Sequence, residues 1–371
     1  MVQVLGVQVL EIQVLGIRGL VPNCQGVPCL DIQQLGAPDQ RCLVLCLSQI
    51  RNIAAARLRA AHVDNDSRVW GEMPERERHS IARELDPPFS VFQPETLRAP
   101  ILFCSPHSGR TYPSILLERS QLQPDALRKS EDCFVDELFA CATAFGAPLI
   151  AAHFPRAYLD VNREPYELDP DLFDEPLPDY ANSRTMRVIG GLGTIARVVS
   201  ESEPIYGRPL PLAAALERIE KLYRPFHAAI GELLDELVDA FGYAFLVDCH
   251  SMPSGAVQKP AAARPDFVIG DRFGSSCDPR LTKIFRHHLN RMGYRVQLNR
   301  PYAGGFITEH YGRPFASRHA IQLEINRGLY LHERTFEKSE TYPQLAQNLQ
   351  RFVAELMTTV PAVLTQQIAA E

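Results

Sequence analysis

The chain has 371 residues, of which 46% are hydrophobic and 22% charged, and its formal net charge is −6. This composition is typical of a globular protein, and because no basic surface is indicated we expect no nucleic-acid partner. No run reaches the roughly 18 apolar residues of a membrane-spanning helix, and nine irregularly spaced cysteines without a leader pattern favour a reducing, cytoplasmic location.

The first 88 residues differ from the rest of the chain. A five-residue unit, Val-Gln-Val-Leu-Gly in its first copy, repeats over residues 2–16. A period of five matches neither a strand nor a helix, so we expect a low-complexity, poorly ordered extension with some β tendency. Residues 74–88 are charged and end in two prolines, which predicts a linker. We therefore divide the chain into an extension over 1–88 and a folded domain over 89–371. The alternative for the extension is a zinc cluster with loose spacing, formed by Cys24, Cys29, Cys42 and Cys46.

From residue 89 onward, short apolar runs alternate with stretches of helical periodicity. The expected strands are 101–104, 148–152, 158–161, 243–248, 267–269, 294–298 and 320–325. The expected helices are 131–145, 212–241, 279–292 and 342–360. This alternation predicts an α/β fold, a three-layer sandwich in which helices cover both faces of a mostly parallel mixed sheet.

Two histidines follow the ends of predicted buried strands. His107 comes just after 101–104, and His250 comes just after the apolar run 244–247. Ligands of open α/β sheets bind beyond the carboxyl ends of the strands, so the two imidazoles are candidates to share one metal ion. An open catalytic zinc site needs a third protein ligand as well. The alternative is that they are two loop histidines with unrelated roles.

Asp132 is the acidic candidate for the third ligand. It lies at the start of the predicted helix 131–145, one turn before Asp136 on the same side and three residues before the apolar Val135, so it is expected to point toward the core. The alternative is that both acids only complement the helix dipole after a Ser130 N-cap.

Glu324 is the candidate catalytic carboxylate. Alternation along the strand 320–325 places Gln322, Glu324 and Asn326 on one side. A carboxylate on a buried strand is costly unless it is paired or functional. Glu324 is therefore expected to accept a proton from an attacking water and to pass it to a leaving amine. The alternative is a salt bridge between Glu324 and a nearby arginine.

Loop arginines are candidates for binding substrate carboxylates. Arg163, Arg197 and Arg313 lie in or next to segments rich in glycine, proline or polar residues. Guanidinium groups bind carboxylates through two parallel hydrogen bonds, which lysine cannot do. We expect a small anionic substrate, although each arginine alone would also fit an ordinary surface position.

Six motifs taken in order resemble the N-formylglutamate amidohydrolase family, over residues 95–355. They are Pro-His-Ser-Gly-Arg-Thr-Tyr-Pro at 106–113, Glu-Asp at 131–132, Asp-Val-Asn-Arg at 160–163, Gly-Thr-Ile-Ala-Arg at 193–197, Val-Asp-Cys-His-Ser-Met at 247–252 and Gln-Leu-Glu-Ile-Asn at 322–326. The resemblance implies a fold similar to the zinc-dependent carboxypeptidases, with one metal at the strand ends. It also implies hydrolysis of N-formyl-L-glutamate to formate and glutamate in histidine breakdown.

The resemblance also implies roles for individual residues. The metal ion, zinc or alternatively cobalt, would be bound by His107, Asp132 and His250; Glu324 would be the general base and acid; and the substrate carboxylates would bind Arg163, Arg197 and Arg313.

Two positions depart from related patterns. The carboxypeptidases have a glutamate three residues after the first histidine, where this chain has Arg110. Deformylases of the family tend to have Asp-Trp-His where this chain has Asp-Cys-Phe at 132–134. The alternatives are a metallohydrolase for another N-acyl amino acid or peptide, and a non-catalytic carboxylate-binding protein on the same scaffold.

Overall fold

The computed structural model describes residues 7–12, 17–22, 75–199, 203–256 and 264–368. The chain divides into two compact units, Met1–Val69 and Trp70–Glu371. In the first unit, β1 (Val7–Ile12) and β2 (Ile17–Pro22) form an antiparallel hairpin. The rest of the predicted extension before residue 75, the four-cysteine cluster included, lies outside the described residues, and the division at residue 88 stays a prediction.

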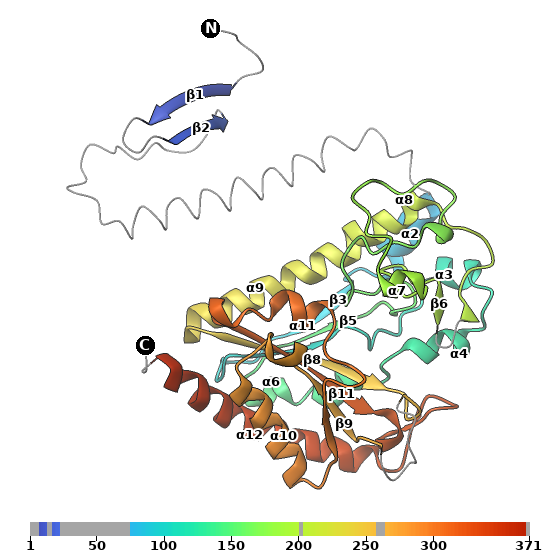
Figure 1. Ribbon diagram of the computed structural model, residues 1–371. Helices are drawn as coiled ribbons and strands as arrows, with labels where there is room; N and C mark the ends of the chain where they lie inside the picture. The colour runs from blue at the N-terminus through green and yellow to red at the C-terminus, as the bar shows by residue number, and fades with distance from the viewer. Residues whose placement is uncertain (1–6, 13–16, 23–74, 200–202, 257–263, 369–371) are drawn as a thin grey trace. The chain divides into compact units, whose positions relative to one another are not determined.

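The second unit is built on a seven-stranded sheet (Figure 1). The strand order is β10 (Val296–Leu298), β9 (Phe267–Gly270), β11 (Arg318–Asn326), β8 (Ala244–Met252), β4 (Ile101–Ser105), β5 (Leu149–Ala152) and β3 (Phe89–Phe92). β9 runs antiparallel to β11 and β3 runs antiparallel to β5, whereas all other neighbours are parallel. This confirms the predicted mostly parallel mixed sheet.

Helices cover both faces of the sheet, which makes three layers (Figure 1). Along β4, Leu102 and Cys104 belong to one hydrophobic core and Ile101 and Phe103 to the other, because successive strand residues face opposite sides. The first core is covered by α2 (Glu75–Glu84), α3 (Ser114–Arg119), α8 (Leu212–Arg218), α9 (Arg224–Phe241) and α11 (Phe306–Tyr311). The second is covered by α5 (Val135–Phe139), α6 (Ala142–Phe145), α10 (Pro279–Arg291) and α12 (Tyr342–Ile368).

Smaller elements complete the described unit. They are α4 (Pro124–Leu127), α7 (Met186–Ile189), β6 (Val198–Val199), β7 (Glu203–Pro204), β12 (Leu331–His332) and β13 (Glu337–Lys338). Within the described residues, no helix combines the length and the apolar character needed to cross a membrane.

Two predicted elements differ in the structure. The helix expected over 212–241 contains a π-helical turn at Ile219–Tyr223, because Pro225 has no amide hydrogen for the next helical bond. The strand expected over 158–161 is a turn instead. There, the Asp160 side chain accepts a hydrogen bond from the Asn162 amide at 2.9 Å, which satisfies the backbone locally and competes with a strand.

The segment expected to be a charged linker forms helix α2. Its glutamates and arginines are good helix formers, and no proline or glycine interrupts it. Glu77 on α2 is fully buried, and its carboxylate accepts hydrogen bonds from Arg218 Nε at 2.8 Å and from the Tyr158 hydroxyl at 2.6 Å. α2 is therefore attached through Tyr158 to the loop that follows β5.

Candidate metal centre

The fold brings the two predicted histidines to one edge of the sheet. His107 lies two residues beyond β4, whereas His250 lies inside the last three residues of β8 rather than beyond it. β4 and β8 are parallel neighbours, and Cys104 is the register partner of Asp248. Both histidines therefore emerge from adjacent strands at the carboxyl end, and their ring centroids are 4.8 Å apart.

Asp132 reaches the histidines from a turn, not from a helix. The predicted helix 131–145 begins only at Val135, because Phe134 has a left-handed backbone with φ of 62°, and it is split into α5 and α6. The acids in the first turn of α5 are Asp136 and Glu137, so Asp132 does not fill the helix-dipole role that was its alternative. Its amide donates instead to the carbonyl of His107 at 3.0 Å, which joins the two main chains.

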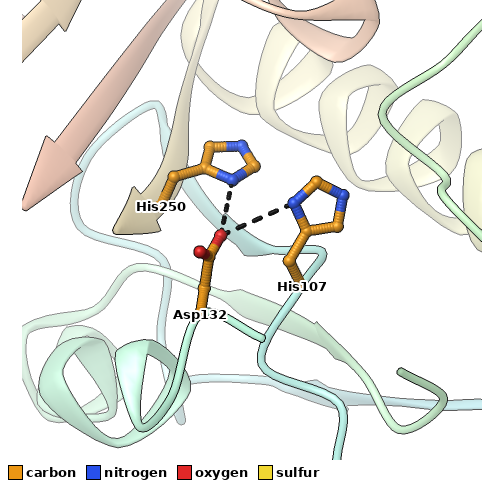
Figure 2. A group of neighbouring side chains, drawn as sticks. All are labelled: His107, Asp132 and His250. Atoms are coloured by element: carbon orange, nitrogen blue, oxygen red, sulfur yellow. Dashed lines mark hydrogen bonds and ion pairs between the residues drawn. The ribbon is translucent and has the colours of Figure 1, made fainter. Parts of the chain in front are cut away.

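Three side-chain atoms converge between these elements (Figure 2). Oδ2 of Asp132 lies 2.9 Å from Nδ1 of His250 and 3.5 Å from Nδ1 of His107. All three ligand atoms lie within 4.8 Å of one another, and all three residues are buried. Imidazole nitrogens with a carboxylate oxygen are a donor set that suits zinc and related divalent ions.

The opposite nitrogen of each ring lies beside a second carboxylate. Nε2 of His107 lies 2.8 Å from Oδ1 of Asp160, and Nε2 of His250 lies 2.9 Å from Oδ1 of Asp248. For His107, a hydrogen bond from Nε2–H to Asp160 leaves the lone pair on Nδ1, the nitrogen that faces Asp132. Nε2 of His250 also has Nδ2 of Asn162 at 3.0 Å. This arrangement is the usual environment of histidines that bind metals.

A second observation also indicates that these residues can bind a metal ion. Nδ1 of His107 is a buried polar atom that has no hydrogen-bond partner among the described residues. Buried nitrogens in folded proteins are nearly always satisfied. A cation placed between His107, Asp132 and His250 would satisfy it.

The charges around the three groups favour a cation. Burial alone would raise the pKa of Asp132, but the neighbouring rings of His107 and His250 hold that pKa well below its ordinary value. Burial likewise lowers the pKa of His250, yet Asp248 and Asp132 raise it well above the usual range. The centre therefore stabilises positive charge.

Glu324 lies one strand away from this centre. It is the register partner of His250 in the parallel pair β11 and β8, and its Oε1 accepts a hydrogen bond from Gln322 Nε2 at 2.8 Å. Burial raises the pKa of Glu324 to about 7. In the described part of the chain no arginine forms an ion pair with this carboxylate, so the salt bridge that was its alternative is not present.

Comparison with known proteins identifies the family. A sequence model of N-formylglutamate amidohydrolases matches residues 99–331. The chain belongs to the N-formylglutamate amidohydrolase family. The match contains both histidines, Asp132 and Glu324, and it confirms the resemblance seen in the motifs.

Relatives of this amidohydrolase family member include two named deformylases and a protein of solved structure. N-formylglutamate deformylase from Pseudomonas putida is 32% identical over 243 residues, covering 64% of this chain and 83% of that protein. The deformylase from Pseudomonas aeruginosa is 32% identical over 244 residues, covering 64% and 84%. The crystal structure of N-formylglutamate amidohydrolase from Ralstonia eutropha JMP134 has a TM-score of 0.70 and 35% identity, covering 74% of this chain and 98% of that one.

In this amidohydrolase family member, one of the three predicted arginines lies next to the centre. Arg163 is buried, and its Nη2 lies 3.5 Å from Oδ2 of Asp160, the carboxylate that holds His107. Arg197 is paired with a carboxylate of its own, Asp169. Arg313 is exposed and donates to the carbonyl of His310 at 3.0 Å. Among the described residues, no hydrogen bond or ion pair joins Arg197 or Arg313 to the three candidate ligands.

Several residues of the centre were not singled out from the sequence. Asp248 precedes His250 by two positions and so shares its side of the strand, which is a signal that alternation alone provides. Asp160 gives no such signal, because 53 residues separate it from His107. Arg156, which lies in the same arginine-flanked segment as Arg163, also borders the centre, since its Nε donates to Oδ2 of Asp160 at 3.0 Å.

Proposed function

We propose that this chain is a metal-dependent amidohydrolase that cleaves the formyl amide of N-formyl-L-glutamate to give formate and L-glutamate. The convergence of His107, Asp132 and His250, with Nδ1 of His107 buried and unpartnered, is the observation that supports this most strongly. The names of the two deformylase relatives support the choice of substrate.

The proposed chemistry divides between the ion and Glu324. A divalent ion held by His107, Asp132 and His250 supplies Lewis acidity, which polarises the scissile carbonyl and makes an attacking water more acidic. Glu324 accepts the proton of that water as its oxygen bonds to the formyl carbon. The carboxyl group then donates the proton to the amide nitrogen as the carbon–nitrogen bond breaks. A carboxyl whose pKa is about 7 is suited to both transfers.

The substrate is small and carries two carboxylates, so it requires cationic partners. We assign this role to Arg163 together with Arg197 and Arg313, and Arg163 is the best supported of them because Asp160 connects it to His107. Bidentate binding by arginine would position the formyl amide over the ion. Zinc is the expected metal, with cobalt as the alternative. A cytoplasmic location stays a prediction from the cysteine pattern, and a role in histidine breakdown stays an implication of the family resemblance.

Two alternatives make different predictions. A metallohydrolase for another N-acyl amino acid would use the same centre with a different acyl preference. A non-catalytic carboxylate-binding protein would need the arginines but neither the metal ion nor Glu324.

A substrate panel with metal removal tests the proposal. The full chain, stripped with a chelator and reconstituted with Zn²⁺ or Co²⁺, is assayed on N-formyl and N-acetyl derivatives of glutamate, aspartate and leucine. We expect activity only after reconstitution and highest on N-formyl-L-glutamate. Full activity in the stripped protein would refute metal dependence. Preference for another acyl group would support the first alternative. Binding of glutamate without any turnover would support the second.

A further inference from the structure

Asp132 has a second carboxylate oxygen that the two histidines do not contact. Its Oδ1 accepts hydrogen bonds from Arg327 Nη2 and from the Ser251 hydroxyl, both at 3.1 Å. The oxygen nearest the histidine Nδ1 atoms is Oδ2. The two oxygens of one carboxylate thus have separate sets of partners.

Arg327 is itself fixed on three sides. It begins the 3-10 turn directly after β11, and its side chain is only 6% exposed. Besides the contact with Asp132, its Nε donates to the Ser251 hydroxyl at 3.0 Å and its Nη1 donates to the carbonyl of Lys129 at 2.9 Å. Every nitrogen of the guanidinium is therefore used. The planar fork connects the end of β11, the end of β8 and the turn that carries Asp132.

This fixed arrangement restricts how Asp132 can bind an ion. A free carboxylate can bind a cation through one oxygen or through both. Oδ1 already accepts two hydrogen bonds, one of them from a cation, and rotation of the carboxylate toward an ion would break both. Binding through Oδ2 alone keeps them. A catalytic centre requires open coordination positions, and a ligand that uses one oxygen leaves one more of them free.

We propose that Arg327, together with Ser251, is a positioning residue that makes Asp132 a one-oxygen ligand. The inference rests on the proposed metal-dependent function and adds to it the residues that keep the coordination sphere open. Neither residue is one of the three candidate ligands. Their effect reaches the reaction through the orientation of Asp132.

Metal binding and cobalt spectroscopy on the full chain test this directly. The variants are Arg327→Met and Ser251→Ala. The matched control is Arg318→Met, which removes an ion-paired arginine, the partner of Asp235, from the opposite end of β11. Zn²⁺ affinity is measured by competition with a chelating dye, and the visible spectrum of the Co²⁺ form reports the number of ligands.

The expected results differ between the variants. Arg327→Met weakens Zn²⁺ binding by about 10- to 100-fold, as is usual when a residue that orients a ligand is lost. Its Co²⁺ absorption per ion also falls, because Asp132 then binds through both oxygens and coordination increases. Ser251→Ala loses the hydrogen bond to Asp132 and the one accepted from Arg327 Nε, but keeps the direct contact of Arg327 with Asp132, so it weakens binding by about 3- to 10-fold. Arg318→Met leaves affinity and spectrum unchanged.

Each other result overturns the inference. Zn²⁺ affinity and a Co²⁺ spectrum like those of the wild type in Arg327→Met would show that Asp132 needs no such support. If Arg327→Met does not fold, as judged by circular dichroism, unchanged values in Ser251→Ala would overturn it equally. A wild-type chain that binds neither Zn²⁺ nor Co²⁺ would refute the proposed metal-dependent function. A wild-type chain that binds metal normally, with an Arg327→Met variant that does the same, would refute only the role of Arg327.

Discussion

Glu324 and His250 are register partners on the parallel strands β11 and β8. A carboxylate on one strand thus lies beside a candidate metal ligand on the next, and both are at the carboxyl end of the sheet. Backbone hydrogen bonding between the strands fixes their relative position, so neither depends on a flexible loop for it.

Replacing Glu324 with glutamine tests its role as base and acid. The amide is nearly isosteric but cannot accept and return a proton, so we expect kcat to fall by about 10²- to 10⁴-fold. Zn²⁺ content and KM should stay within a few-fold of the wild type. Glu309→Gln, at an exposed carboxylate on α11, serves as the control. A Glu324→Gln variant with nearly full kcat would exclude this residue as the base.

The pH dependence of activity follows from the same group. Burial raises the pKa of Glu324 to about 7, and below its pKa the protonated carboxyl cannot accept a proton from water. The profile of kcat/KM should therefore rise with pH and level off once Glu324 is ionised. A bound divalent cation favours the ionised form, so the apparent pKa should lie between the ordinary 4.5 and about 7. An acid limb that persists unchanged in the Glu324→Gln protein would assign it to another group.

Asp160 should affect metal binding and stability together. Burial raises its pKa, but Arg156, Arg163 and His107 hold it well below the ordinary value. A lowered pKa in the folded state stabilises the protein above the unfolded pKa, and this contribution is lost as the pH falls toward the folded pKa. Asp160→Asn should weaken Zn²⁺ binding by about 10- to 100-fold. It should also destabilise the protein in urea unfolding at pH 7 more than at pH 3. Equal Zn²⁺ affinity of variant and wild type would contradict the role of Asp160.

Glu77 should be important for stability although it lies outside the region that matches the family. Its carboxylate and Arg218 are both fully buried, and breaking such a pair leaves an unpaired charge in the core. We expect Glu77→Gln to lower the free energy of unfolding by about 3–5 kcal/mol in urea at pH 7. Burial raises the pKa of Glu77, but Arg218 and Tyr158 lower it by more, so its pKa in the folded protein lies below 4.5. The difference in unfolding free energy between wild type and Glu77→Gln should therefore shrink as the pH falls below 4.5.

A matched exposed pair provides the control for that measurement. Glu118 forms an ion pair with Arg76, and both side chains are more than half exposed. Glu118→Gln should lower the free energy of unfolding by at most about 1 kcal/mol. If Glu77→Gln and Glu118→Gln lower the free energy of unfolding by similar amounts, burial does not make the Glu77–Arg218 pair more important for stability than an exposed pair.

Local sequence patterns were sufficient for most of the fold. The strand around Leu102 and the helix beginning at Pro279 were predicted because hydrophobic periodicity is a property of neighbouring residues. The turn at Asp160 and the π-helical turn before Pro225 were missed, since a side-chain hydrogen bond in one case and a missing amide in the other overrode an apolar pattern.

The candidate metal centre could be predicted from the sequence only in part. His107 and His250 follow apolar runs, so their position at the strand ends can be read locally. The contact of His250 with Asp132 spans 118 residues, and that of Arg327 with Asp132 spans 195. Such contacts depend on the order of strands in the sheet, which periodicity does not specify. The arginines show the same limit, because only the folded chain separates Arg163, beside Asp160, from Arg197, paired with Asp169.

The zinc content of the purified chain tests the central claim most directly. The protein is loaded with Zn²⁺, dialysed against metal-free buffer and analysed by mass spectrometry for zinc per chain, alongside His107→Ala and His250→Ala. We expect about one zinc per wild-type chain, as for a single catalytic site, and a large loss in both variants. Equal zinc in all three proteins, or none in a wild type that is still fully active, would contradict a metal centre at His107, Asp132 and His250.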